Sequence, residues 1–414
     1  MTAARQARIP QLDGLRGCAI LAVLACHGFG RYYGMRLRAG LLLEQVASNG
    51  WVGVDLFFIL SGFLLGGILL DTKGKPGYFR KFFLRRAGRI LPLYYAWLLI
   101  YLAAQAISLG RVAEPGLPYF FLFGQNIGMA SGQIASNWWT APSWSLAVEE
   151  QFYLSLPLAI AILSPRSLRR ALTAYLVAAP VVRGLAISLL HLRSVYPLYV
   201  LLPTHGDGLA IGVLLAMLVR NESALTFYLR NRRAIGLVAF GLALNTAVIL
   251  VRAVGPEPFP PITAHTYTPI ALVCGCLLLE SVAVPGGWCA RVLSIRPLRF
   301  FGAISYCLYL FHPIGLRVSE ALILARLPSL HVTLAGYLFV KLLHLGIAMA
   351  LVIPLCVLSG RFFERPFLRL ARASSVTENP AAGRNTAAGG QADRRCRNEG
   401  ISGTSGHRLP AKPR

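Results

Sequence analysis

Two residues of the first apolar segment could serve proton transfer and anion binding. Arg16 and His27 stand eleven residues apart. In an α-helix this spacing brings both side chains to one face, with roughly 16 Å of axial rise between them. A neutral imidazole can take a proton from a hydroxyl group, and a guanidinium can bind phosphate. The structural alternative is a snorkelling arginine with a hydrogen-bonded histidine near the membrane interface.

A second polar group lies in the apolar segment 144–163. Glu149 and Glu150 are adjacent, so a helix directs their carboxylates about 100° apart and both cannot simply cap the helix and face water. We therefore expect at least one of them to take part in a site. Other polar side chains are expected at a similar depth in neighbouring segments: Asp55, Ser61, Ser145, His205, Asp207, Tyr309 and His312. Their convergence indicates general acid/base chemistry inside the membrane, where an unpaired charge is costly.

Arginines gather just before the third apolar segment. Arg85, Arg86 and Arg89 lie in the run 82–92, and Arg86 and Arg89 share a face if that run is helical. Guanidinium groups suit phosphate because they form bidentate hydrogen bonds. The alternative is the ordinary basic anchor at the cytoplasmic end of a membrane helix.

Composition places these residues in a membrane protein. Of 414 residues, 56% are hydrophobic and 14% are charged, whereas a soluble domain carries about a quarter charged residues. The net charge of +25, from 41 Lys+Arg against 16 Asp+Glu, fits nucleic acid or an anionic membrane surface. The apolar excess argues against nucleic acid and excludes a soluble enzyme. The eight cysteines show no C-x-x-C pair and no zinc spacing, so we expect no metal site and no disulfide framework.

Ten apolar runs near the length of a bilayer core must position these residues. They predict an all-α, polytopic membrane protein with about ten transmembrane helices over residues 12–29, 51–70, 91–109, 144–163, 172–190, 200–219, 235–251, 267–284, 300–316 and 332–358. Loop charge favours both termini in the cytoplasm, because the inside loops then carry about twice the Lys and Arg of the outside loops. Residues 1–372 then form the transmembrane domain. Residues 373–414 lack apolar periodicity and predict a disordered basic cytoplasmic tail.

The longest predicted outside loop, 110–143, contains the aromatic run 119–123. This run is too short to span a bilayer. We expect it to lie in the membrane interface or to dip back into the membrane.

Several segments match motifs of a known family in their order along the chain. They are the opening 12–17 with Arg16 followed by His27, the run 54–63, the arginine motif 86–92, Trp144-Ser145-Leu146 with 149–153, and three weaker segments at 207–212, 309–313 and 364–367. Together, from Ile9 to about Leu370, they resemble the integral-membrane acyltransferase family 3.

The resemblance implies O-acylation, often O-acetylation, of carbohydrates such as lipopolysaccharide O-antigen, exopolysaccharide or peptidoglycan, while some relatives modify macrolides or other small molecules. It implies acyl-CoA, commonly acetyl-CoA, as the donor substrate, a carbohydrate or lipid-linked glycan as the acceptor, and a place in the bacterial cytoplasmic (inner) membrane. His27 is the catalytic residue that it carries over. Some members add an outer hydrolase-like domain, and no loop or tail of this sequence is long enough for one.

These observations combine in one hypothesis. Arg16, Arg86 and Arg89 hold the phosphates of coenzyme A at the inner face, and the acyl-pantetheine arm extends along the first helix. His27 then removes the proton of an acceptor hydroxyl, or carries the acyl group briefly itself.

The acidic residues have separate expected roles. Glu149 or Glu150 orients the imidazole of His27 or stabilises its charged form. Asp13 cannot do so, because about 21 Å of helix separates it from His27, and we expect it to pair with Arg16.

Two other function classes stay open. A secondary transporter with a buried His/Glu proton relay also fits ten helices with polar residues inside. An acyl-binding sensor without turnover fits a phosphate cradle. The acceptor, the acyl chain length and the oligomeric state are not readable from the sequence.

Overall fold

The structure, a computed structural model, describes residues 9–29, 44, 46–111, 114, 116–135, 137–192, 194–252, 261–324 and 334–376. These residues form helices and no strand, which confirms the all-α prediction. The predicted disordered tail begins at residue 373, but residues 373–376 form the end of a helix, so that boundary is corrected. Residues 377–414 lie outside the described residues, and their disorder stays a prediction.

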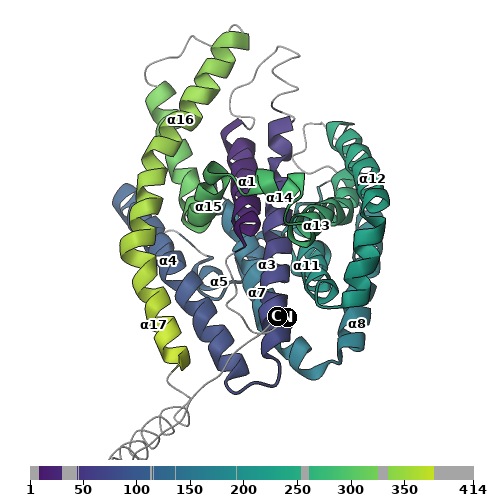
Figure 1. The fold of residues 1–414 in the computed structure, drawn as a ribbon. Coiled ribbons are helices and arrows are strands. Elements are labelled where there is room, and N and C mark those ends of the chain that lie inside the picture. The colour runs from purple at the N-terminus through teal and green to yellow at the C-terminus, as the bar shows by residue number, and fades with distance from the viewer. Residues whose placement is uncertain are drawn as a thin grey trace, which may run out of the picture.

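Among the described residues, eleven helices of twelve or more residues build a bundle (Figure 1). They are α1 (Pro10–Phe29), α3 (Val52–Thr72), α4 (Tyr78–Leu109), α7 (Trp144–Ile162), α8 (Pro165–Leu189), α11 (Asp207–Leu218), α12 (Glu222–Arg252), α13 (Tyr267–Ala283), α15 (Arg296–Leu324), α16 (Leu334–Leu358) and α17 (Arg365–Val376). Short turns of helix connect them: η1 (Asn49–Trp51), α5 (Leu117–Phe121), α6 (Gln125–Ala130), η2 (Ala141–Ser143), α9 (Tyr196–Val200), α10 (Leu202–His205), η3 (Pro261–Thr266), α14 (Trp288–Leu293) and the π-helical turn η4 (Ser359–Glu364).

Eight segments of the described chain are long and apolar enough to cross a membrane. They correspond to eight of the ten predicted runs. The other two runs are also helical: 300–316 lies within α15, which is not among these eight, and 200–219 contains the short apolar helix α11. The prediction of a polytopic membrane protein is therefore confirmed.

The helices divide into central and peripheral ones. Figure 1 shows α1 and α3 in the middle, with α4, α16 and α17 on one side and α8 and α12 on the other. Of the apolar stretch of α3, 72% is buried, against 11% for α8 and for α12. Peripheral helices leave large apolar side chains exposed, as expected where the neighbour is lipid.

The structure differs from the predicted third run at its start. Helix α4 begins at Tyr78, not near Leu91, so Arg85, Arg86 and Arg89 lie on a helix instead of in a loop. The aromatic run 119–123 falls in and after α5, which is held to α4 because the hydroxyl group of Tyr94 donates to the carbonyl oxygen of Phe120 (2.8 Å).

The predicted run 200–219 is not one helix. Pro203 has no N–H to donate to the carbonyl of Tyr199, four residues earlier, so the ladder breaks between α9 and α10. The freed carbonyl is 2.7 Å from Nδ1 of His205, which donates to it. Tyr175 of α8 satisfies two more backbone groups at the break, donating to Leu202 O and accepting from the N–H of Gly206. The break is therefore compensated inside the protein, as hydrocarbon surroundings require.

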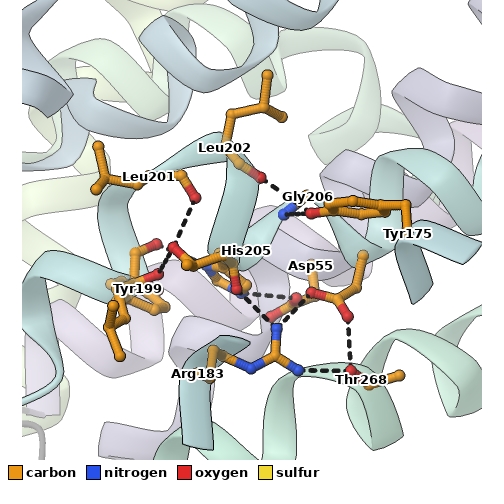
Figure 2. A network of polar contacts seen from close by, with 12 residues as sticks. Asp55, Tyr175, Arg183, Tyr199, Leu201, Leu202, His205, Gly206 and Thr268 are labelled. Atoms are coloured by element: carbon orange, nitrogen blue, oxygen red, sulfur yellow. Dashed lines mark hydrogen bonds and ion pairs between the residues drawn. The ribbon is translucent and has the colours of Figure 1, made fainter. Parts of the chain in front are cut away.

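A buried ion-pair network fixes the broken segment to its neighbours (Figure 2). Nη1 of Arg183, on α8, donates to Oδ2 of Asp207 (2.9 Å), and Thr268 of α13 donates to Oδ1 of the same carboxylate (2.6 Å). Nε2 of His205 lies 3.0 Å from Oδ1 of Asp55 on α3. Because Nδ1 of His205 already donates, one further proton must lie between His205 and Asp55. Nη1 of Arg183 also donates to the carbonyl oxygen of Thr204 (2.7 Å), so the network joins α3, α8, α10, α11 and α13.

Helices α1 and α15 approach each other very closely. A Cβ added at Gly302 would lie 1.8 Å from the carbonyl oxygen of Asp13, and one added at Gly17 would lie 2.0 Å from the carbonyl oxygen of Leu298. Only glycine permits this spacing, which is how small residues bring membrane helices together.

We expect Gly302→Ala to destabilise the bundle by about 1–3 kcal/mol, because the new methyl group must push α1 away from α15. Gly346→Ala in α16 is the matched control, since nothing lies within 4 Å of the Cβ that it adds. Thermal unfolding of the purified protein in detergent measures both. Equal melting temperatures for the two variants would contradict the close approach.

Removing Arg183 tests the buried network. Arg183→Met leaves the carboxylate of Asp207 buried without its cation, a loss of about 3–5 kcal/mol. The double variant Arg183→Met/Asp207→Asn removes both charges and is expected to recover part of that loss. The fraction of folded protein at rising temperature compares them, and a double variant no better than Arg183→Met would rule out the charge as the cause.

Candidate active site

The structure joins two histidines from different helices. Nδ1 of His27, near the end of α1, lies 2.9 Å from Nε2 of His312 on α15, and the rings stack at 4.9 Å between centroids. His312 is fully buried, whereas His27 is exposed. The outer edge of His27 is therefore the part of the pair that a substrate can reach.

The hydrogen bonds fix which nitrogen of each neutral ring carries the proton. Nδ1 of His312 is 2.8 Å from the carbonyl oxygen of Tyr309, which can only accept, so this Nδ1 is protonated. Nε2 of His312 must then accept, and Nδ1–H of His27 donates to it. Nε2 of His27 is then the unprotonated nitrogen, and no hydrogen bond joins it to another of the described residues. This is the nitrogen that a general base or a nucleophile needs.

Tyr309 connects the histidine pair to α7. Its hydroxyl group is 2.7 Å from Oγ of Ser145 and donates to the carbonyl oxygen of Pro142 (2.9 Å). Since Ser145 precedes Glu149 by one helical turn, both side chains lie on the same face of α7, and Glu149 continues the row of polar groups that begins at His27.

Glu149 stands at the middle of this row. Its Oε1 accepts from Ser61 of α3 (2.8 Å), and its Oε2 accepts from Tyr153 (2.8 Å). Tyr153 is buried, whereas Glu149 and Ser61 are half-buried. This carboxylate is thus held by two hydroxyl groups from two helices.

Three arginines, Arg16, Arg86 and Arg89, lie at the other end of this row of polar groups. The charges of Arg86 and Arg16 act on Glu149, and those of Arg16, Arg86 and Arg89 act on one another. Nη1 of Arg16 pairs with Oδ1 of Asp13 (3.3 Å), which confirms the predicted pair. Because like charges repel, such a group of arginines is stable only where an anion or a carboxylate offsets the repulsion. Guanidinium groups suit a phosphate anion because they form bidentate hydrogen bonds with it.

The path therefore runs from the arginines through Glu149 and Tyr309 to His27. It uses α1, α3, α4, α7 and α15. The rise along α1 from Arg16 to His27 is about 16 Å, so one extended ligand could touch an arginine with one end and His27 with the other.

Two sequence predictions are corrected. Glu149 and Glu150 do not hydrogen-bond to His27: the partner of its Nδ1 is His312, and Glu149 binds Ser61 and Tyr153. Oε1 of Glu150 is buried and has no hydrogen-bond partner among the described residues, and the charge of Glu150 acts on Arg86. The carboxylates therefore belong to the arginine end of the path.

Asp55 and Asp207 belong to the network of Figure 2, not to this path. Arg183 was not among the predicted site residues, although an arginine inside an apolar segment is a signal that a buried partner must exist. Tyr153 was not predicted either, although its place four residues after Glu149 puts both on one helix face.

The described residues hold no group of three or more His, Cys, Asp or Glu side chains placed to bind a metal ion. The chemistry of the path is that of imidazole, hydroxyl, carboxylate and guanidinium groups.

Comparison with known proteins adds the family. A family model described as an acyltransferase domain matches residues 9–361. The peptidoglycan O-acetyltransferase OatA of Listeria monocytogenes is 24% identical over 73% of this chain and 49% of its own length, and the putative peptidoglycan O-acetyltransferase YrhL of Bacillus subtilis is 28% identical over 73% and 48%. The O-acetyltransferase OatA of Staphylococcus aureus is 25% identical over 86% and 57%.

The chain spans about half the length of these curated relatives. No solved structure matches it. The family model, however, covers nearly all of the helical bundle, including both ends of the polar path. The chain therefore belongs to the integral-membrane acyltransferase family 3.

Proposed function

We propose that the protein is a membrane O-acyltransferase that moves an acyl group, acetyl by analogy with its relatives, from acyl-CoA to a hydroxyl group of a carbohydrate. The observation that carries this proposal is the free Nε2 of His27 at one end of a polar path whose other end is a group of arginines. Family membership favours this reaction over the transporter and the non-catalytic sensor.

In the proposed reaction, Nε2 of His27 takes the proton of the acceptor hydroxyl as its oxygen attacks the thioester carbonyl. The new C–O bond forms, the C–S bond breaks, and the departing thiolate takes the proton to leave as the coenzyme A thiol. A brief acyl-histidine at the same nitrogen is the second route, and both need the tautomer that His312 imposes.

Arg16, Arg86 and Arg89 have the role of donor binding in this proposal. Glu149 offsets their mutual repulsion and is itself held by Ser61 and Tyr153. The acceptor is a cell-surface glycan: peptidoglycan, the substrate in the relatives' names, is the first to test, with O-antigen, exopolysaccharide and lipid-linked glycans next. The proposed location is the bacterial inner membrane with cytoplasmic termini, which puts the arginines on the acyl-CoA side.

We expect His27→Ala to lower acyl transfer by about 10²–10⁴-fold, the usual contribution of a general base. His312→Phe keeps a ring but removes the acceptor for Nδ1–H of His27, so we expect a lower kcat at an unchanged KM for the donor. Labelled acetyl-CoA added to membranes with a glycan acceptor measures both. His344→Ala is the control, because this buried histidine bonds Ser319 instead of the path. Full acylation by His27→Ala would disprove the role of His27.

The arginines at the other end of the path predict an effect on the KM for the donor instead of on kcat. Arg86→Ala should raise the KM for acetyl-CoA by about tenfold or more, because a charge-assisted hydrogen bond contributes about 1.5–3 kcal/mol. Acetyl-phosphopantetheine, which lacks the nucleotide phosphates, should lose much less. Arg85→Ala removes the same charge from the neighbouring, exposed position and serves as the control. Equal losses with both donors would mean that Arg86 does not bind the nucleotide phosphates.

A further inference from the structure

A cavity of about 520 Å³ lies outside the polar path. Its walls are α12, the end of α13 and the turn that leads to α14, and none of its lining residues belongs to the proposed acyl-transfer site. The volume lies within the range of small-molecule pockets, about 300–1,000 Å³.

The lining carries one positive charge in excess. Its charged residues are Arg232, Arg233 and a single carboxylate, Glu280. This carboxylate is already held by Nη1 of Arg232 (3.2 Å) and by the hydroxyl group of Tyr228 (2.7 Å). Arg233 is exposed, and the lining contains no second carboxylate that could pair with it. The charge matches a monoanionic group such as a phosphodiester, which guanidinium groups bind well.

The cavity lies where α12 changes from basic to lipid-facing. Arg232 and Arg233 precede Ile235 and Gly236, which also line it, and the next residues, Leu237 and Val238, are 73% and 72% exposed. A charged turn followed by exposed apolar side chains marks the headgroup level of a spanning helix.

The rim adds a second sign of the interface. Trp288, at the start of α14, lines the cavity and is 73% exposed. Tryptophan is enriched at the level of the headgroups. Gly236 leaves open space, since a Cβ placed there would meet nothing within 4 Å.

We propose that this cavity binds the phosphodiester headgroup of an anionic phospholipid, with its acyl chains lying along the exposed apolar face of α12. A free phosphate would satisfy the arginines, but it would use neither the volume nor the apolar wall that continues from the cavity onto α12. Basic pockets between membrane helices bind lipid headgroups in this way. The site is independent of acyl transfer, so either proposal can fail without the other.

The test is lipid retention by the full chain. Protein reconstituted with equal amounts of phosphatidylglycerol and phosphatidylcholine is released into the gas phase, and native mass spectrometry counts the bound lipids. We expect phosphatidylglycerol to be retained over phosphatidylcholine. Arg233→Ala should lower this preference about fivefold, the effect of removing one basic residue near an anionic headgroup. Arg230→Ala is the control, since Arg230 is exposed on the same helix but does not line the cavity.

A second variant separates shape from charge. Gly236→Leu keeps both arginines and adds a bulky side chain to the cavity wall, so we expect it to lower retention as well. Unfolding temperatures of the variants show whether each remains folded. Equal loss in Arg230→Ala and Arg233→Ala would overturn the proposal, as would retention unchanged in Gly236→Leu. Displacement of the lipid by millimolar inorganic phosphate would assign the site to a free phosphate and overturn it too.

Discussion

A polar group within a membrane bundle must find its partner inside the protein, and this constraint underlies the whole structure. Hydrocarbon offers no hydrogen bonds, so an unpaired charge or backbone group there is costly. Three pairs of described polar residues meet the constraint across helices: Arg183 with Asp207, Glu149 with Ser61, and His27 with His312. The contacts that hold the helices in register are therefore also those that position the chemistry.

The same constraint explains which parts of the fold the sequence could predict. A span needs about 20 apolar residues, a local property, so eight predicted runs reappear as spanning segments. The prediction of one helix over 200–219 was wrong because the break at Pro203 is compensated by Tyr175 of another helix, which no local pattern reveals. The predicted start of the third span was wrong because Arg85, Arg86 and Arg89 were counted as loop charges, although helix α4 continues through them.

The site was predictable in its residue types but not in its pairings. Buried His, Glu, Ser and Arg were recognised from their position within apolar runs. Which ones touch depends on how α7 and α15 are rotated about their axes, and periodicity within one helix says nothing about that rotation. Glu149 or Glu150 was therefore expected beside His27, whereas the structure gives His27 a histidine partner and places Glu149 near the arginines.

A histidine partner changes the electrostatics of the proposed reaction. A carboxylate beside His27 would favour its protonated form and would need its own compensation in hydrocarbon. Neutral His312 needs none, and its Nδ1–H is bound to a backbone carbonyl that cannot take a proton. Nε2 of His312 can share the Nδ1 proton of His27, but His312 can pass no proton on to its carbonyl partner. In the proposed direct transfer, the proton taken from the acceptor therefore stays within the histidine pair until the thiolate departs, and Nε2 of His27 both takes and returns it.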